Sequence, residues 1–231
     1  MYGVKVPAIT SRRERLRAET TREIMTIALR QMAEAGPGGI SLRGIAREMG
    51  MTARAIYSYF PTRDDLVTAL IGDLGAALAD ALESARDAAP DDPGERLLAW
   101  GDALRDWSLS NPQGFRLIYG DPVPGYRAPD DGPAAQAARR ICGGLNRLVA
   151  AACTAEPDDG FAWSDFPAGY RSKIETEAGD LSPAVVALAL RVWGRMHGLV
   201  SLEIHGHLSA VANDPGAIYR AELRNLVASL G

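Results

Sequence analysis

The segment at residues 41–60, SLRGIAREMGMTARAIYSYF, constrains the fold more than any other part of the chain. Gly50 can form a tight turn between two helices. Ser41, before the first helix, and Thr52, before the second, are good N-cap residues. The small Ala46 faces inward in the first helix, and Ile56 in the second helix is placed to pack against it. This register predicts two short helices that cross steeply, a helix-turn-helix.

Helical patterns continue along the rest of the chain. Apolar residues recur at i, i+3, i+4 and i+7, while no stretch alternates with the period of a strand. Residues 121–133 hold four prolines and are expected to form a loop, and a short helix is expected near 167–177 within the mixed segment 154–181. We predict an all-α fold. Besides the short helix near 167–177, helices are expected near residues 11–35, 41–48, 52–59, 63–88, 94–109, 112–119, 134–154, 183–206 and 215–229.

The chain divides into two predicted domains of opposite charge. We place an N-terminal helix-turn-helix domain at residues 1–62 and a larger helical domain at residues 63–231. Residues 1–70 carry 11 Lys and Arg against 7 Asp and Glu, a net charge of +4, although the whole chain carries −4. A basic N-terminal domain joined to an acidic larger domain is typical of proteins in which one domain contacts DNA.

Several classes of protein are disfavoured by what the sequence lacks. It has no Gly-rich phosphate loop, no nucleophile elbow and no HExxH motif, so we predict neither an enzyme nor a cofactor. Cys142 and Cys153 are too few for a disulfide framework. No apolar run approaches the roughly 20 residues of a membrane helix, and no signal-peptide pattern is seen. We therefore expect a reduced, cytoplasmic protein without a membrane partner.

Residues 15–71 resemble the DNA-binding motif of the TetR family of transcriptional regulators. The resemblance rests on the segment quoted above and its continuation, MTARAIYSYFPTRDDLVTALI, in which caps, turn glycine, aromatic pair and following arginine fall in register. The sequence RVWGRMHGLVSLEIHGHL at residues 191–208 resembles the Trp-x-x-x-His-Gly element of one TetR subgroup. Membership implies a homodimeric repressor that binds a palindromic operator in double-stranded DNA and is released by an unknown small-molecule effector.

The resemblance also implies which residues contact DNA. Hydroxyl groups, a helix N-terminus and a cation suit phosphate oxygens, whereas arginine can donate two bonds to guanine and alanine methyl groups can touch thymine. The predicted DNA-binding residues are Ser41, Arg43, Thr52, Ala53, Arg54, Ala55, Tyr57, Tyr59 and Arg63. Five preceding arginines form either a basic arm that reaches DNA or a solvated helix face beside glutamates; they are Arg12, Arg13, Arg15, Arg17 and Arg22.

The C-terminal domain is expected to dimerise and to sense the effector. Small residues on the helices 134–154 and 183–206 suit either a four-helix dimer interface or packing within one subunit; they are Ala137, Ala138, Gly143, Gly144, Ala187, Gly194 and Gly198. The predicted effector pocket uses aromatic residues, each of which can instead fill the core; they are Trp100, Trp107, Phe115, Tyr119, Tyr126, Trp193 and His197.

The sequence also allows three alternatives to this interpretation: a metal site, a protein-binding adaptor and an activator. Glu203, His205 and His207 suggest a metal site, but the two histidines point apart on a helix, so no metal is predicted. A helical adaptor that binds protein through the same motif is disfavoured by Arg54 and Arg63. An activator with the same DNA contacts stays open. In each regulator hypothesis, effector binding tilts the helix at 63–88 and changes the spacing of the recognition helices.

Overall fold

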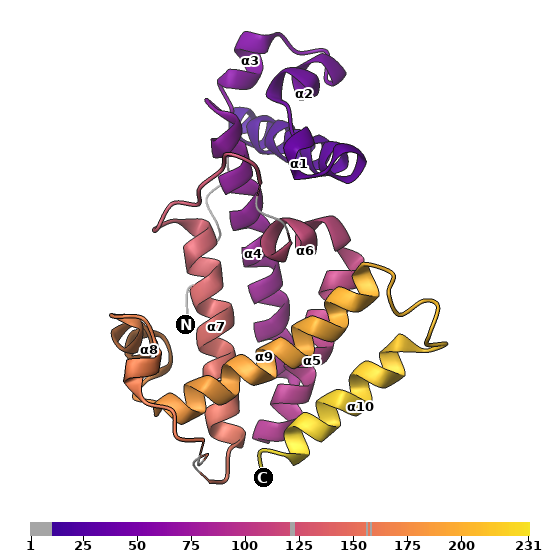
Figure 1. Ribbon diagram of the computed structural model, residues 1–231. Helices are drawn as coiled ribbons and strands as arrows, with labels where there is room; N and C mark the ends of the chain where they lie inside the picture. Colours follow the sequence, from indigo (N-terminus) through magenta and orange to yellow (C-terminus); the bar gives the residue numbers. More distant parts are fainter. Residues whose placement is uncertain (1–10, 121–122, 156, 158) are drawn as a thin grey trace, which may run out of the picture. The chain divides into compact units, whose positions relative to one another are not determined.

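The computed structural model describes residues 11–120, 123–155, 157 and 159–231, and it confirms the all-α prediction, because these residues form helices and no strand (Figure 1). Every helix predicted from the sequence is present, including the short one near 167–177. The α-helices are α1 (Arg12–Ala35), α2 (Leu42–Glu48), α3 (Ala53–Tyr57), α4 (Arg63–Ala88), α5 (Pro93–Ser110), α6 (Pro112–Tyr119), α7 (Pro133–Ala152), α8 (Tyr170–Ala178), α9 (Pro183–Ile204) and α10 (Pro215–Ala228). Two 3₁₀ turns are η1 (Pro37–Gly39) and η2 (Trp163–Asp165).

The chain forms two compact units, each with its own core. The first unit contains the residues up to Leu70 together with the segment 120–127, and the second unit contains residues 71–119 and 128–231. Helix α4 contributes to both, since its residues up to Leu70 belong to the first unit and the rest to the second.

The core of the first unit is enclosed by α1, α2, α3 and the beginning of α4. Ile24 and Ala28 of α1, Ile45 of α2, Ile56 of α3 and Leu66 of α4 are each 0% exposed. Ala46 and Ile56, the inward positions predicted for the helix-turn-helix, are both buried. Burial of these side chains sets the orientation of the two short helices, which are too short to be stable by themselves.

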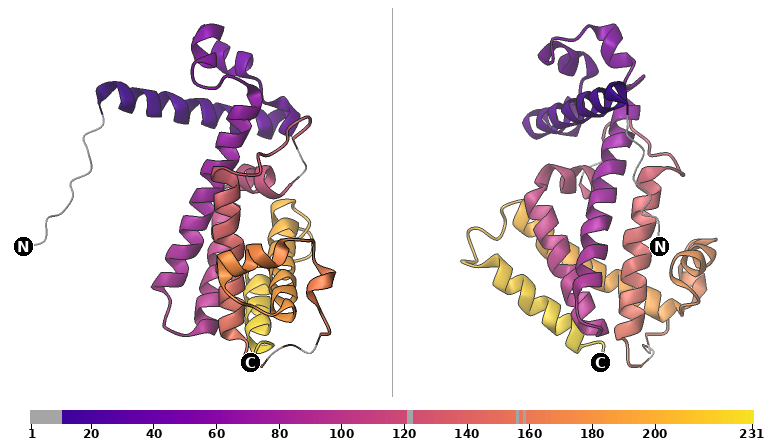
Figure 2. Two further views of the ribbon diagram at one scale, coloured as in Figure 1. Left: turned by 90° about the vertical axis from the view of Figure 1, so that its left-hand side faces the viewer. Right: turned by 180° about the vertical axis from the view of Figure 1, so that it is seen from behind.

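In the second unit α7 packs against α5, α8 and α9, while α10 lies against α5 and α9 (Figure 2). Tyr219 of α10 is buried, and its hydroxyl donates a hydrogen bond to the Gly101 carbonyl of α5 at 2.8 Å. Gly144 of α7 lies so close to α5 that an added Cβ atom would be 2.4 Å from Cη2 of Trp100. The small residue is what allows the two helices to approach.

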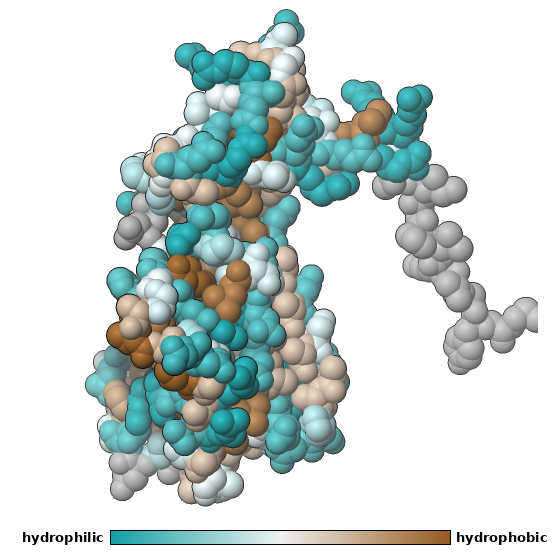
Figure 3. Space-filling model, turned by 90° about the vertical axis from the view of Figure 1, so that its right-hand side faces the viewer, coloured by the Kyte–Doolittle hydropathy of each residue, from teal (hydrophilic) through white to brown (hydrophobic). Residues whose placement is uncertain are grey.

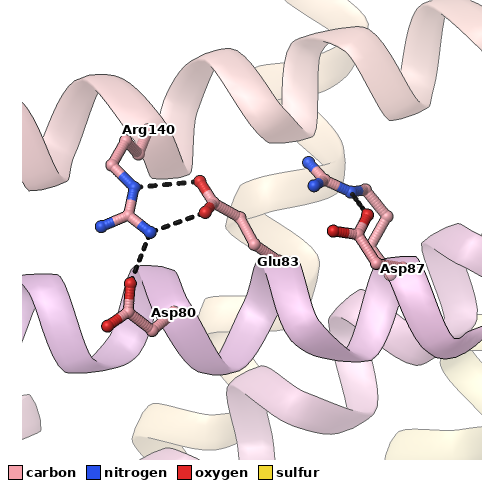
Figure 4. Close-up of polar contacts among 5 residues, drawn as sticks. Asp80, Glu83, Asp87 and Arg140 are labelled. Carbon is pink, nitrogen blue, oxygen red and sulfur yellow. Dashed lines mark hydrogen bonds and ion pairs between the residues drawn. The ribbon is translucent and has the colours of Figure 1, made fainter. Parts of the chain in front are cut away.

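An ionic cluster joins α4 to α7 within the second unit (Figure 4). Arg140 of α7 donates from Nε to Glu83 at 3.0 Å and from Nη2 to Glu83 at 2.6 Å and to Asp80 at 2.5 Å. These hydrogen bonds lower the pKa of Glu83 against the opposing effect of its burial. Gly75 brings the same helices together, since an added Cβ atom there would lie 2.9 Å from Cβ of Ala137.

Helix α9 is unusually apolar for a helix with so much exposed surface. It is the one helix in the described ranges that is long and apolar enough to cross a membrane, with a mean hydropathy of 1.3, and 33% of that stretch is buried. The sequence analysis singled out no such segment, because Arg191 and Arg195 interrupt the apolar residues. Arg191 binds Asp159 at 2.5 Å, and Arg195 binds Glu222 of α10. Length and composition alone are weak evidence for a membrane span.

Candidate functional site

The helix-turn-helix is capped as the sequence predicts. Ser41 Oγ accepts a hydrogen bond from the Gly44 amide at 3.2 Å, and Thr52 Oγ1 accepts one from the Ala55 amide at 3.2 Å. Gly50 lies in the left-handed region with a φ of 64°, which favours glycine over residues with a Cβ atom. These local interactions determine where α2 and α3 begin and which residues of α3 face outward.

The three arginines of α2 and α3, Arg43, Arg47 and Arg54, are exposed and have no side-chain partner among the described residues. Two of them, Arg43 and Arg54, were predicted to contact DNA. Ala53 and Tyr57 of α3 are also exposed, and Ala55 is half-buried. An arginine whose donors are satisfied only by water can bind a phosphate oxygen or a guanine edge without first breaking an internal ion pair.

Tyr59, the second residue of the aromatic pair Tyr57 and Tyr59, is held in place by α1. The Arg17 guanidinium lies over the Tyr59 ring, 4.7 Å from its centroid, and its Nη2 donates to the Ser58 carbonyl at 2.9 Å. Tyr59 is consequently half-buried. The arginines considered for a basic arm are all exposed and lie on α1, which begins at Arg12: Arg12, Arg13, Arg15, Arg17 and Arg22.

Arg63 is directed into the first unit. Its half-buried guanidinium donates from Nε to the Ile40 carbonyl at 3.2 Å and from Nη2 to the Pro37 carbonyl at 3.0 Å. Nη1 donates to the Pro124 carbonyl at 3.2 Å. The arginine therefore ties the chain around η1 and the segment 120–127 to the start of α4. Sequence reasoning did not foresee these three carbonyl contacts, because each acceptor lies at least 23 residues from Arg63 along the chain.

The second unit contains a partly open cavity of about 220 Å³ whose wall is formed by α4, α6, α7, α8 and α9. Of the aromatic residues predicted to form a pocket, Tyr119 and Trp193 line this cavity. Tyr126 belongs to the first unit, where its hydroxyl lies 3.0 Å from Oγ1 of Thr68. No Asp, Glu, Lys or Arg is among the described residues that line the cavity, so its wall is mostly apolar.

The other predicted pocket aromatics lie in the core or beside the cavity. Trp100 and Phe115 are 0% and 1% exposed, and Trp107 packs against the same core. His197 stacks on Phe115 and meets Tyr119 edge-on, with 5.1 Å between ring centroids in each pair. Burial lowers the pKa of His197, whose Nε2 is buried without a partner, so the ring is neutral at neutral pH.

Asn146 is a cavity residue that the sequence analysis missed. It lines the wall from α7 and is 6% exposed. Its Nδ2 donates to the Cys142 carbonyl one turn earlier at 2.8 Å, whereas its Oδ1 is buried and has no partner. The available signal was a polar side chain at an inward position of an otherwise apolar helix. Burial of such a side chain is unfavourable unless its donors and acceptors form hydrogen bonds.

Glu203 is engaged with an arginine and not with neighbouring histidines. Arg105 donates from Nε and Nη2 to the two carboxylate oxygens of Glu203 at 2.8 and 2.7 Å. His205 Nδ1 lies 2.8 Å from the Ser201 carbonyl. The described residues contain no group of three side chains suited to hold a metal ion.

The small residues predicted for a dimer interface divide into two groups. Gly144 of α7 faces the Trp100 ring inside its own unit. Gly194 and Gly198 of α9 have no atom within 4 Å of an added Cβ and therefore border open space. Ala137 of α7 and Ala187 of α9 are also buried, whereas Ala138 of α7 is exposed, so each helix has both buried and exposed small residues.

Comparison with known proteins agrees with this architecture. Residues 24–70 match the family described as bacterial regulatory proteins, tetR family, and residues 97–226 match the family described as tetracyclin repressor-like, C-terminal domain. The chain is 34% identical over 224 residues to the HTH-type transcriptional regulator Rv1816 of Mycobacterium tuberculosis, and the alignment covers 95% of each chain.

Solved structures share the fold. The putative regulatory protein SCO4313 is 34% identical, with a TM-score of 0.74 over 95% of this chain and 100% of that chain. A TetR variant from Acinetobacter baumannii, crystallised in complex with minocycline, has a TM-score of 0.50 at 17% identity, over 89% of this chain and 93% of that chain. This second likeness supports the fold alone.

Proposed function

Because the chain belongs to the TetR family of bacterial transcriptional regulators, we propose that it is a homodimeric repressor, released from a palindromic operator when a small molecule fills the cavity of the second unit. DNA binding through the helix-turn-helix is the activity of the family. Repression, dimerisation and release by an effector are the parts that we propose.

The observation that carries the proposal is the pair of unpartnered arginines, Arg43 and Arg54, on the exposed face of the motif. Helix α3 has only 5 residues, so it offers few contacts to bases, and phosphate contacts supply most of the affinity. We assign base contacts to Ala53, Arg54 and Ala55, and phosphate contacts to Ser41, Arg43, Thr52, Tyr57 and Tyr59. Arg63 acts from inside the first unit by holding the start of α4.

The test is binding of the purified protein to the intergenic DNA beside its own gene over a series of salt concentrations. Arg54→Ala is expected to lower both affinity and sequence discrimination, and Arg43→Ala to lower the salt slope by about 1 per subunit. Arg171→Ala removes an exposed arginine of α8 and is the matched control, with no expected effect.

Two outcomes would change the proposal. If no sequence-specific binding occurs even at low salt, the protein-binding adaptor becomes the better interpretation. Transcription in vitro from a promoter that contains the bound site separates the remaining alternatives, because a repressor lowers it and an activator raises it.

We place the dimer face on α9 and α10. Leu190, Gly194, Gly198 and Leu202 follow one another at i+4 spacing and form a stripe on α9. Leu190 is 51% exposed, Leu202 41% and Ile218 of α10 45%. Apolar residues also interrupt the polar surface of the second unit in the space-filling view (Figure 3). Two copies of this helix pair would bury the stripe in a four-helix bundle around a twofold axis.

The dimer is tested by sedimentation of the full chain. Leu202→Glu introduces a charge into the stripe and is expected to shift the protein to monomer and to abolish operator binding. Val211→Glu, at an exposed residue outside both helices, is the control and should stay dimeric. A Leu202→Glu variant that stays dimeric would remove α9 from the interface.

Helix α4 is the proposed connection between effector and DNA. Ile71 and Gly75 of α4 line the cavity, and the same helix begins with Arg63 in the first unit. An effector that prefers one tilt of α4 would change the spacing of the recognition helices in the dimer. The contacts of Arg140 with Asp80 and Glu83 stabilise one arrangement of α4 and α7, so they set the free energy that the effector must overcome.

A further inference from the structure

The wall of the cavity contains few groups that can recognise a ligand. Apolar side chains such as Ile118, Ile141 and Leu145 form most of it. The side chains with polar atoms are those of Tyr119, Cys142, Asn146, Tyr170 and Trp193. Neither tyrosine hydroxyl forms a hydrogen bond with another described residue. A ligand is therefore held mainly by apolar contact and oriented by few hydrogen bonds.

Among these groups, Asn146 has the one fully buried polar atom that lacks a partner among the described residues. Its amide nitrogen already donates to the Cys142 carbonyl at 2.8 Å, while Oδ1 is buried without a partner. The side chain is 6% exposed, so bulk water does not compensate. A buried acceptor left unpaired is unfavourable. Oδ1 is closed to a water-sized group in this structure, so a ligand donor reaches it after the Asn146 amide or a neighbouring side chain has shifted, and the hydrogen bond is then regained.

The charges near the wall favour a neutral ligand. Burial raises the pKa of the Cys142 thiol, with a further contribution from the charge of Glu177, and burial raises the pKa of Glu177 itself. Glu177 is not among the described residues that line the cavity, and an anionic ligand would find no cation among them. A cationic ligand would find the carboxylate already surrounded by Lys173, Arg139 and Arg147, which act on it electrostatically.

The size of the cavity limits the ligand further. Its volume is about 220 Å³. An engineered apolar cavity of about 150 Å³ binds benzene, so this one has room for a somewhat larger molecule, such as two fused rings. The rings of Tyr119 and Trp193, with centroids 5.4 Å apart, present aromatic surface to such a molecule.

From this wall we infer that the effector is an uncharged, compact, mostly apolar compound of one or two rings that donates a hydrogen bond to Oδ1 of Asn146. The inference rests on the proposed function for its regulatory meaning. The binding specificity itself concerns the cavity alone and is tested without DNA.

The test compares three probes with the same ring system by titration calorimetry on the full chain. Naphthalene lacks a donor, 2-naphthol carries a neutral donor, and 2-naphthoate carries a negative charge. We expect 2-naphthol to bind about ten-fold more tightly than naphthalene, as for one added hydrogen bond to a buried acceptor. The charged 2-naphthoate should bind most weakly.

Two variants assign the preference to the cavity. Asn146→Leu has a similar size and no acceptor, so it should bind 2-naphthol and naphthalene equally. Ala138→Trp places an indole at an exposed position of the wall, where folding is not at risk, and should block both neutral probes. Circular dichroism verifies that each variant is folded.

A labelling experiment locates the bound probe. Cys142 is exposed and lines the cavity, so iodoacetamide in mildly alkaline buffer should alkylate it in a Cys153→Ala background. Bound 2-naphthol should slow this reaction and naphthoate should not. Protection without any effect of Asn146→Leu on affinity would overturn the role of Asn146.

The remaining outcomes are equally decisive. Equal affinity for naphthalene and 2-naphthol in the unaltered protein, tightest binding of 2-naphthoate, or no binding of any probe would overturn the inferred class of ligand. Operator binding with and without 2-naphthol is measured separately. If 2-naphthol binds as expected and operator affinity does not change, the proposed release fails while the specificity of the cavity stands.

Discussion

The contact between Gly144 and Trp100 allows a quantitative test of the second unit. An added Cβ atom at Gly144 would lie 2.4 Å from Cη2, 3.1 Å from Cζ3 and 3.2 Å from Cζ2 of Trp100. All of these atoms belong to the six-membered ring of the indole, and the side chain is 0% exposed. A rigid ring inside a packed core cannot move aside without disturbing its neighbours.

The expected energies follow from two opposing effects of Gly144→Ala. Overpacking of a core costs about 1–3 kcal/mol, whereas replacement of a helical glycine by alanine gains about 1 kcal/mol. We therefore expect a net loss of up to about 2 kcal/mol in the free energy of unfolding, or up to roughly 8 °C in Tm for a chain of this size. Trp100→Phe removes the clashing ring, so in that background Gly144→Ala should stabilise by up to about 1 kcal/mol.

The assay is urea denaturation of the four proteins of this double-mutant cycle, followed by far-ultraviolet circular dichroism at one protein concentration. The cost of Trp100→Phe by itself cancels in the cycle, and only the interaction of the two sites remains. A change of sign between the backgrounds supports the packing. If Gly144→Ala stabilises the unaltered protein, or destabilises both backgrounds equally, then Trp100 does not fill this part of the core.

Two further predictions concern ion pairs. Because Arg140 lowers the pKa of Glu83, the pair stabilises the folded state above the unfolded-state pKa of this carboxyl group and loses that effect as the pH falls through the lowered value. Glu83→Gln should therefore cost about 0.5 kcal/mol near neutral pH and almost nothing in acid, as urea midpoints at several pH values would reveal; a loss that is independent of pH would contradict this cause. Glu203→Gln leaves Arg105 incompletely paired in a site where both side chains are under 20% exposed, and we expect a loss of about 1–3 kcal/mol in a thermal melt. Added zinc should not change the Tm of the unaltered protein, and a rise would revive the metal hypothesis for Glu203.

The helix-turn-helix was predictable because its determinants are local. Caps at Ser41 and Thr52, the turn at Gly50 and the apolar period all act between residues a few positions apart. The exposed arginines of the motif were found for the same reason. A helix of this kind can have only one apolar face, so its remaining residues face outward.

The candidate effector cavity was harder to predict. Aromatic residues were expected around it, but two of them, Trp100 and Phe115, are buried in the core. Their chemistry suits a core and a pocket equally, and only the positions of neighbouring helices distinguish the two. Asn146 was overlooked because its importance depends on Oδ1 having no partner, which is a property of the surroundings.

The sequence by itself determined the all-α architecture, the bounds of the helices and the DNA-binding motif, since backbone hydrogen bonds, caps and periodic burial depend on near neighbours. Only the tertiary structure decided that Arg63 faces three carbonyls, that Gly144 serves internal packing, and that Gly194 borders open space. These contacts join residues from distant parts of the chain. Their partners are set by how the helices pack, and a pattern along one helix does not contain that information.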